Sequence, residues 1–256
     1  MTNSEISAVA MCQSAYDSGC SPSDFLKKEN VVVISKENPN ARRYLKLPFE
    51  CDLTTYGGNI VASVSEELRD DVTEYINKYD RCHCFETPNL HFLMNKLRPK
   101  GLDICFMAEY FLPDMNVFKI IGCDYEVMIL QKEDFAEYYL PEWSNALCEG
   151  RKQLDSLAAG AFKGDKLIGL AGASADCDTM WQIGVDVLPE YRKQGIASAL
   201  TSRLAAEIMN LGKVPFYCCA WSNIASARNA VKSGFRPAWV QVTAKKIEEI
   251  EKINNI

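Results

Sequence analysis

The sequence predicts a mixed α/β protein, and three observations support this fold class. Of its 256 residues, 48% are hydrophobic and 24% are charged, which is typical of a globular chain and argues against disorder. Residues 157–174 form two apolar runs around a Gly-Asp turn, the pattern of a β-hairpin. Strand and helix patterns then alternate, so we expect hairpin strands followed by strand–helix–strand units in an α/β (α+β) mixed sheet.

The first half is predicted to contain three helices and three strands. Residues 4–27, 65–79 and 89–97 have helical patterns. The strands are the runs "NVVVIS", "RYLKLPFECDL" and "NIVASV", and the polar turn "KENPNA" separates the first two.

The second half has a clearer order of elements. "YEVMILQ" reads as a strand, and residues 133–156 read as one or two helices around Pro141. The hairpin follows, with its turn at Gly164 and Asp165. Three further strands are predicted, namely "MWQIGVDVLP", "VPFYCCAW" and "FRPAWVQVTAKK".

Two helices are predicted between these last three strands. The second has Asn223 or Ser222 as its N-cap and stops at Gly234. We expect its inward side chains to be Ile224, Ala227 and Val231. The first helix begins near residue 192, with an apolar face made of Ile196, Leu200, Leu204, Ile208 and Leu211.

We expect two domains, over residues 1–124 and 125–256. The two domains share a weak internal sequence similarity. "IVASVSEELRDDV" resembles "IGVDVLPEYRKQG", with Arg69 opposite Arg192, and "NLHFLMNKLRPKG" resembles "NIASARNAVKSGF". A degenerate repeat and a chance similarity of amphipathic strand–helix units both explain it. The first copy has lost the glycine, since Asp70, Asp71 and Val72 follow Arg69, and its acidic helix start should not bind phosphate.

The net charge limits the kinds of partner that we expect the protein to bind. The chain has 34 acidic and 28 basic residues, a formal net charge of −6, which disfavours a nucleic-acid partner and fits a cationic or amine-bearing one. It has no signal-like start and no apolar run that approaches the length of a membrane span. We therefore expect no membrane association and a cytoplasmic location.

The eleven cysteines do not suggest a disulfide scaffold, because their number is odd and several lie in apolar runs such as "FYCCAW". We expect reduced, mostly buried thiols. His83 between Cys82 and Cys84 resembles a metal-binding pattern, but no second ligand pair stands at a usable spacing, so we expect no metal.

The junction "RKQGIA", where an apolar strand ends and a helical pattern starts, fits an anion. A helix N-terminus presents unpaired N–H groups and a partial positive charge. Gly195 has no Cβ to block a ligand, Ala197 is small, and Arg192 and Lys193 add charge. A plain strand-to-helix turn explains this hexapeptide equally well. The motifs of nucleotide-binding loops are missing, so nucleoside triphosphates and dinucleotides are poor fits.

The wider context resembles the GNAT N-acetyltransferase superfamily over roughly residues 125–245. The similarity rests on R-x-x-G-x-A after "V-x-P-E-Y", followed about thirty residues later by "N-x-x-S" and "K-x-G-F". It implies the GNAT fold, a catalytic second domain, and acetyl-CoA as cosubstrate. The residues it assigns to that cosubstrate are Val185, Val187, Arg192, Lys193, Gln194, Gly195, Ile196, Ala197, Ser198, Asn223 and Ser226.

Acyl transfer to an amine needs a neutral amine, a polarised carbonyl and a proton for the leaving thiolate. Many members of this family place a tyrosine four residues after the "N-x-x-S" serine as the acid, where this chain has Ala230. Tyr217 is a substitute acid or a packed strand residue, and water is another candidate acid. Asp186 is a candidate base, acting directly or through water; alternatively it holds a cationic substrate or makes a hydrogen bond at the strand end.

The acceptor side is expected to involve Gln182 together with Glu142, Trp143 and Asn145, which lie in the segment that the family resemblance places over the acceptor site. The last three could equally be surface residues. The expected reaction is direct attack of a primary amine on acetyl-CoA in a ternary complex, with a small, cationic molecule or a peptide as acceptor.

The main alternative is a non-catalytic acyl-CoA-binding or regulatory protein, motivated by Ala230. A structural protein with an incidental helix cap is a third reading. The sequence leaves the oligomeric state open, and a homodimer is one option.

Overall fold

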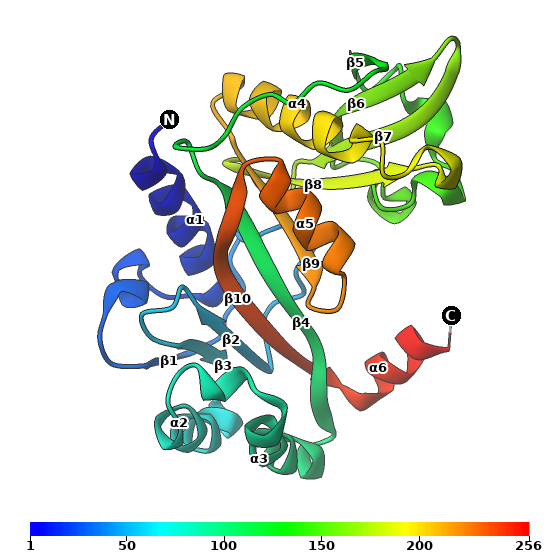
Figure 1. Cartoon of the computed structure of the whole chain (residues 1–256). Coiled ribbons are helices and arrows are strands. Elements are labelled where there is room, and N and C mark those ends of the chain that lie inside the picture. The colour runs from blue at the N-terminus through cyan, green and yellow to red at the C-terminus, as the bar shows by residue number, and fades with distance from the viewer. Residues whose placement is uncertain (256) are drawn as a thin grey trace. The chain divides into compact units, whose positions relative to one another are not determined.

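The computed structural model describes residues 1–255 as a mixed α/β chain with two compact units (Figure 1). The first comprises Met1–Ala10 with Tyr110–Pro237, and the second comprises Met11–Glu109 with the chain from Ala238 on. These two units do not coincide with the predicted domains, which divide the chain between residues 124 and 125. That residues 1–124 and 125–256 are separate domains stays a prediction.

The second unit contains a sheet in which β1 runs parallel to β3, while β2 pairs antiparallel with both β3 and β10. One apolar core packs α2 and α3 against this sheet. The elements that lie wholly or partly in this unit are α1 (Asn3–Ser18), β1 (Val31–Ile34), β2 (Cys51–Thr55), β3 (Val61–Val64), α2 (Arg69–Lys78), α3 (Thr87–Leu97), β4 (Leu102–Pro113), β10 (Phe235–Lys246) and α6 (Ile247–Asn254), with the 3-10 turns η1 (Pro22–Leu26), η2 (Glu66–Leu68), η3 (His83–Phe85) and η4 (Arg98–Lys100).

The first unit contains an antiparallel run from β5 to β8 and a parallel pair of β8 and β9. α4 lies along β6, β7 and β8 (Figure 1). The elements are β5 (Glu126–Leu130), β6 (Asp155–Lys163), β7 (Lys166–Ser174), β8 (Met180–Val187), α4 (Ile196–Asn210), β9 (Val214–Ala220) and α5 (Ile224–Lys232), with the 3-10 turns η5 (Ala136–Tyr138), η6 (Pro141–Trp143), η7 (Glu149–Arg151) and η8 (Pro189–Tyr191).

The two faces of β8 are covered by different parts of the first unit. Side chains alternate along a strand, so Ile183 and its alternate neighbours point to the core cluster that contains Ile196 and Leu200 of α4. Gln182, Gly184 and Asp186 point to the opposite face. This division decides which side chains of the strand reach the candidate site.

Most predicted strands are confirmed, including the hairpin, whose Gly164 has φ +59°. Three differences occur in the first half. The helix expected over 4–27 ends at Ser18, and "RYLKLPFECDL" is a strand only from Cys51 on. β4 was not predicted, because most of its side chains are half-buried and no two-residue alternation marks it.

The prediction of one or two helices over residues 133–156 is wrong. The segment contains three separate 3-10 turns. The N–H groups of Asn145 and Ala146, which a helix would pair with carbonyls four residues earlier, donate to the carboxylate of Asp186 instead.

The predicted inward face of α5 is also wrong in part. Ile224 and Val231 are exposed, whereas Ala230 is fully buried. The caps are as expected, since the Asn223 side chain accepts from the N–H of Ser226 and Gly234 follows the helix with φ +88°. In α4 the apolar face is buried except for Leu211, which lies at the exposed C-cap.

No helix among residues 1–255 is both long and apolar enough to cross a membrane. In the same residues, no group of three or more His, Cys, Asp or Glu side chains is placed to hold a metal ion. All eleven cysteines are free thiols, but only four of them are buried, fewer than the sequence suggested.

Candidate active site

A pocket of about 880 Å³ lies between β8 and β9 at the start of α4. The parallel pairing joins Met180–Gln182 to Val214–Phe216. Past this stretch, residues of both strands up to Val187 and Ala220 line the pocket, so the strands separate there. An unpaired strand edge offers backbone N–H and C=O groups to an extended ligand that contains amides.

The start of α4 forms one end of the pocket. Gly195 is its N-cap, with φ +83°, a left-handed conformation that favours glycine. A Cβ there would meet nothing closer than Lys232 Nζ, at 3.9 Å, so the approach to the helix start is open. In the described residues no acceptor takes the N–H groups of Gly195, Ile196 and Ala197, as expected for the first turn of a helix.

Lys193 adds a second left-handed residue to this turn, with φ +63°. It is the one residue other than glycine with positive φ in the described chain. Such backbone costs about 1 kcal/mol or more and tends to persist at functional sites. The strained turn is therefore a candidate ligand site.

Four cations line this end of the pocket, and two of them were not predicted. Arg192 and Lys193 come from the turn, while Arg228 and Lys232 come from α5. Within residues 1–255 none of the four has a carboxylate within ion-pair distance, and Arg192 Nε donates to the carbonyl of Val187 at 3.0 Å. The helical spacing of 225, 228, 229 and 232, all lining residues, would have revealed this face of α5.

A polar chain joins β9, α5 and α4 inside the pocket. The hydroxyls of Tyr217 and Ser226 are 2.7 Å apart, and Ser198 Oγ donates to Asn229 Oδ1 at 3.1 Å. Tyr217 is almost fully buried, and this burial raises the pKa of its phenol above the ordinary value, although hydrogen bonds from Ser226 and Asn229 oppose the shift. The phenol therefore keeps its proton at neutral pH. Asn229 was not singled out in the sequence.

Asp186 lines the pocket and accepts three hydrogen bonds from one neighbouring segment. The donors are the Asn145 N–H at 2.8 Å, the Asn145 Nδ2 at 2.7 Å and the Ala146 N–H at 2.9 Å. Asp186 is the one acidic residue among the pocket-lining residues, and no cation pairs with it in the described chain.

The other predicted residues are divided between the pocket and its surroundings. Gln182 lines the pocket and donates to Cys218 Sγ at 3.2 Å. Gln194 does not line the pocket, because its amide accepts from the Tyr125 hydroxyl at 2.6 Å. Glu142 is exposed and Trp143 is buried in an apolar cluster, and neither lines the pocket. The pocket does include Val185, Val187, Ile196, Ala197, Ser198, Asn223 and Ser226.

Residues 124–235 match the profile of the acetyltransferase (GNAT) family. This segment is a GNAT domain. The resemblance predicted for residues 125–245 is therefore confirmed, and the pocket lies within the GNAT domain. None of the curated proteins compared with this chain matches it.

Solved structures of low identity accompany this match. A GNAT-family protein of Novosphingobium aromaticivorans has 20% identity and a TM-score of 0.44, covering 56% of this chain and 66% of its own. A GCN5-related N-acetyltransferase from Kribbella flavida has 13% identity and a TM-score of 0.49, covering 75% and 82%. The protein yncA of Salmonella typhimurium, solved with acetyl-CoA, has 17% identity and a TM-score of 0.34, covering 48% and 94%. The chain spans slightly less than two thirds of the first of these structures.

Proposed function

We propose that this protein is an acetyl-CoA-dependent N-acetyltransferase that acts on a primary amine of a small, cationic molecule or a peptide. The amine attacks the thioester directly in a ternary complex. The observation that carries the proposal is a single pocket in which an open helix start with four unpaired cations continues into an unpaired strand edge.

The chain's own groups fit acetyl-CoA along this pocket. The free N–H groups from Gly195 to Ala197 and the charges of Arg192 and Lys232 suit a pyrophosphate, because a helix N-terminus and cations stabilise anions together. The free edge of β8 near Val185 suits the amide-bearing arm of the cosubstrate. Bound there, acetyl-CoA supplies an activated acetyl group.

The residues around the strand gap supply the rest of the chemistry. A backbone N–H of β8 polarises the thioester carbonyl, and the pocket holds the two reactants together. Tyr217, which is protonated at neutral pH, donates a proton to the leaving thiolate, and Ser226 orients its hydroxyl. The proton that the amine loses as the amide forms returns through water to the Tyr217 phenolate, so the enzyme ends the cycle unchanged. This assignment replaces the usual tyrosine, since Ala230 is buried in the core and faces no ligand.

The charge pattern supports the choice of acceptor. The basic end of the pocket suits phosphates, and Asp186 places one negative charge on the acceptor side. The net charge of −6 disfavours nucleic acid as a partner. A polyamine, an amino sugar or an amino-acid derivative fits this pattern, and a peptide amine fits it as well.

The alternative function is a non-catalytic acyl-CoA-binding protein. The buried Ala230 favours it, because the position usually held by the acid has no hydroxyl. This alternative shares the cosubstrate pocket and differs only in the transfer step.

The test is release of free thiol from acetyl-CoA with a panel of amines, with binding measured separately by calorimetry. Wild type should bind acetyl-CoA and release thiol with at least one cationic amine. Tyr217→Phe should lower kcat by about 100-fold, the size expected for loss of a general acid, and leave the Kd of acetyl-CoA within about twofold. Tyr138→Phe, outside the pocket, is the matched control.

Each other outcome has a distinct meaning. Tight binding without thiol release for every amine favours the regulatory alternative. No binding of acetyl-CoA contradicts both functions. Full activity of Tyr217→Phe keeps the transferase and removes Tyr217 as its acid.

A further inference from the structure

We infer that Asp186 is a positioning residue that docks residues 144–147 on β7 and β8, so that Asn145 forms the acceptor-side wall of the pocket and shapes acceptor choice. This inference rests on the proposed transferase function. Of the roles considered for Asp186, it favours the hydrogen bond over the base. The carboxylate accepts two backbone N–H groups on Oδ2 and the Asn145 amide on Oδ1, all from this one segment.

Two glycines provide the surface on which the segment rests. Gly172 of β7 and Gly184 of β8 are cross-strand partners. A Cβ on Gly184 would lie 1.8 Å from the carbonyl oxygen of Asn145, and a Cβ on Gly172 would lie 1.9 Å from that of Ala146. No side chain fits in either place, so the backbone of the segment lies directly on the backbone of the sheet.

Apolar and polar contacts hold the same segment on both sides. Trp143 and Leu147 are buried in a core cluster with Leu170 of β7. Immediately after the segment, the N–H of Cys148 donates to Asp155 at 2.9 Å, and the Tyr139 hydroxyl donates to the same oxygen at 3.1 Å. The segment thus has a fixed path although it is not a helix.

The three hydrogen bonds use most of the acceptor capacity of the Asp186 carboxylate. All three donors are N–H groups, so each needs an acceptor oxygen, and together they occupy three of about four lone pairs. The visible role of the carboxylate is therefore to hold this segment.

The docked segment brings Asn145 to the wall of the pocket, on the side that we assign to the acceptor. Asn145 lines the pocket beside Gln182, Gly184 and Asp186, the face of β8 that points away from α4. An error of about 1 Å in such a wall is enough to cost on the order of 100-fold in rate. We therefore expect the segment to affect the amine and not the binding of acetyl-CoA.

Asp186→Asn and Asp186→Ala separate positioning from base catalysis. In Asp186→Asn the amide oxygen still accepts both backbone N–H groups, and its NH₂ donates to the Asn145 side chain once that amide flips. We expect this variant to keep kcat within about fivefold and to keep the acidic limb of the pH profile, whereas removal of a general base costs about 100-fold or more. Its KM for a cationic amine should rise, because the pocket loses its one negative charge. Asp186→Ala should lower kcat/KM for the amine by about 10- to 100-fold and raise its KM.

Gly172→Ala tests the docking without touching a polar group or a lining residue of the pocket. Its Cβ should displace the segment and reproduce the kinetic effect of Asp186→Ala, with acetyl-CoA Kd within about twofold of wild type. Gly150→Ala is the matched control, because a Cβ there meets nothing within 4 Å and its φ is not positive. It should behave as wild type.

Hydrogen exchange at the amides of Asn145 and Ala146 gives a readout that needs no activity. These amides should be protected in wild type and in Asp186→Asn, and exposed in Asp186→Ala and Gly172→Ala. If Asp186→Asn lowers kcat by about 100-fold or more while protection stays intact, the inference is overturned and Asp186 is restored as the base. Unprotected amides in wild type would also overturn it. If wild type shows protection and releases no thiol with any amine, the docking stands and the transferase function fails.

Discussion

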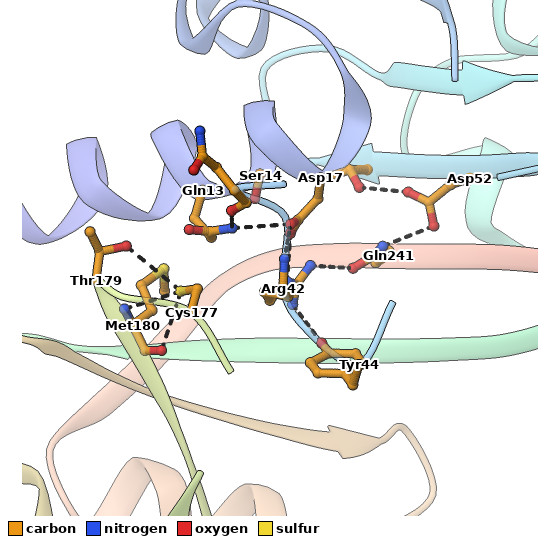
Figure 2. A network of polar contacts seen from close by, with 12 residues as sticks. Gln13, Ser14, Asp17, Arg42, Tyr44, Asp52, Cys177, Thr179, Met180 and Gln241 are labelled. Atoms are coloured by element: carbon orange, nitrogen blue, oxygen red, sulfur yellow. Dashed lines mark hydrogen bonds and ion pairs between the residues drawn. The ribbon is translucent and has the colours of Figure 1, made fainter. Parts of the chain in front are cut away.

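In the second unit Arg42 is buried and pairs with buried Asp17. In the GNAT domain Arg192 and Lys232 line the pocket, and neither forms an ion pair with a carboxylate of the described chain. Figure 2 shows that the Arg42 guanidinium also donates to Tyr44 and Gln241, and that Gln241 donates to Asp52. Charges that satisfy one another hold a scaffold together. Charges left without partners are available to a ligand.

The strand–turn–helix junctions before α2 and before α4 show the same contrast between paired and unpaired charges. At the first, η2 runs directly into α2 without a glycine, Arg69 pairs with Glu66 at 3.0 Å, and Asp71 pairs with Lys96 at 3.2 Å. At the second, Gly195 opens the turn before α4. An acidic first turn with paired charges does not attract phosphate. Whether the first junction is a degenerate copy of the second stays a prediction.

The largest expected effect is on the paired network. Arg42→Ala leaves Asp17 as an uncompensated buried charge, so the free energy of unfolding should fall by about 3 to 5 kcal/mol. Urea unfolding measures this loss. The exposed pair offers the control, since Arg69→Ala should cost less than about 1 kcal/mol. A similar cost for the two variants would mean that burial does not distinguish the network.

The unpaired cations should show the opposite response. Arg192→Glu combined with Lys232→Glu should raise the Kd of acetyl-CoA by about 100-fold, because each cation would make a charge-assisted hydrogen bond to phosphate. The free energy of unfolding should change by less than about 1 kcal/mol. Arg69→Glu combined with Lys100→Glu, at the first junction, should leave the Kd unchanged. Equal losses of affinity for both pairs would show a general charge effect.

A smaller effect concerns pH. Burial raises the pKa of Asp52 to about 6, although hydrogen bonds from Thr243, Gln241 and Thr54 lower it. Because the folded state then binds the proton more tightly than the unfolded state, this contribution to stability is present below the ordinary pKa and is lost as pH rises towards 6.

Asp52→Asn should remove that slope. Between pH 4 and pH 7, wild type should lose about 2 kcal/mol relative to Asp52→Asn in the free energy of unfolding. Urea unfolding at both pH values gives the difference. A constant difference between the two proteins across this range would contradict the raised pKa.

The sequence predicts the elements whose formation depends on a short local pattern of residues. The hairpin, the strands from β5 to β10 and the turn at Gly195 follow from alternation, helical spacing and one glycine over short stretches. β4 lacks such alternation and was missed. The inward face of α5 was misjudged, because the exposed Ile224 and Val231 suggested a core that Ala230 forms instead.

The acceptor side could not be predicted in the same way. The path of residues 144–147 depends on Asp186, 41 positions later in the chain, and on a pair of glycines on two other strands. The local pattern predicts a helix around Pro141, because the carboxylate of Asp186, which takes the N–H groups instead, is distant in sequence. Arg228, Asn229 and Lys232 became site residues only through the packing of α5 beside the turn.

The most direct test of the account is calorimetric titration of acetyl-CoA into wild type, Gly195→Glu and Gly164→Glu. Both glycines have positive φ and open surroundings, so the two substitutions strain the backbone alike, but only Gly195 lies in the pocket. We predict that wild type and Gly164→Glu bind and that Gly195→Glu, which places a carboxylate at the phosphate end, does not. Binding by Gly195→Glu with the affinity of wild type, or no binding by wild type, would contradict it.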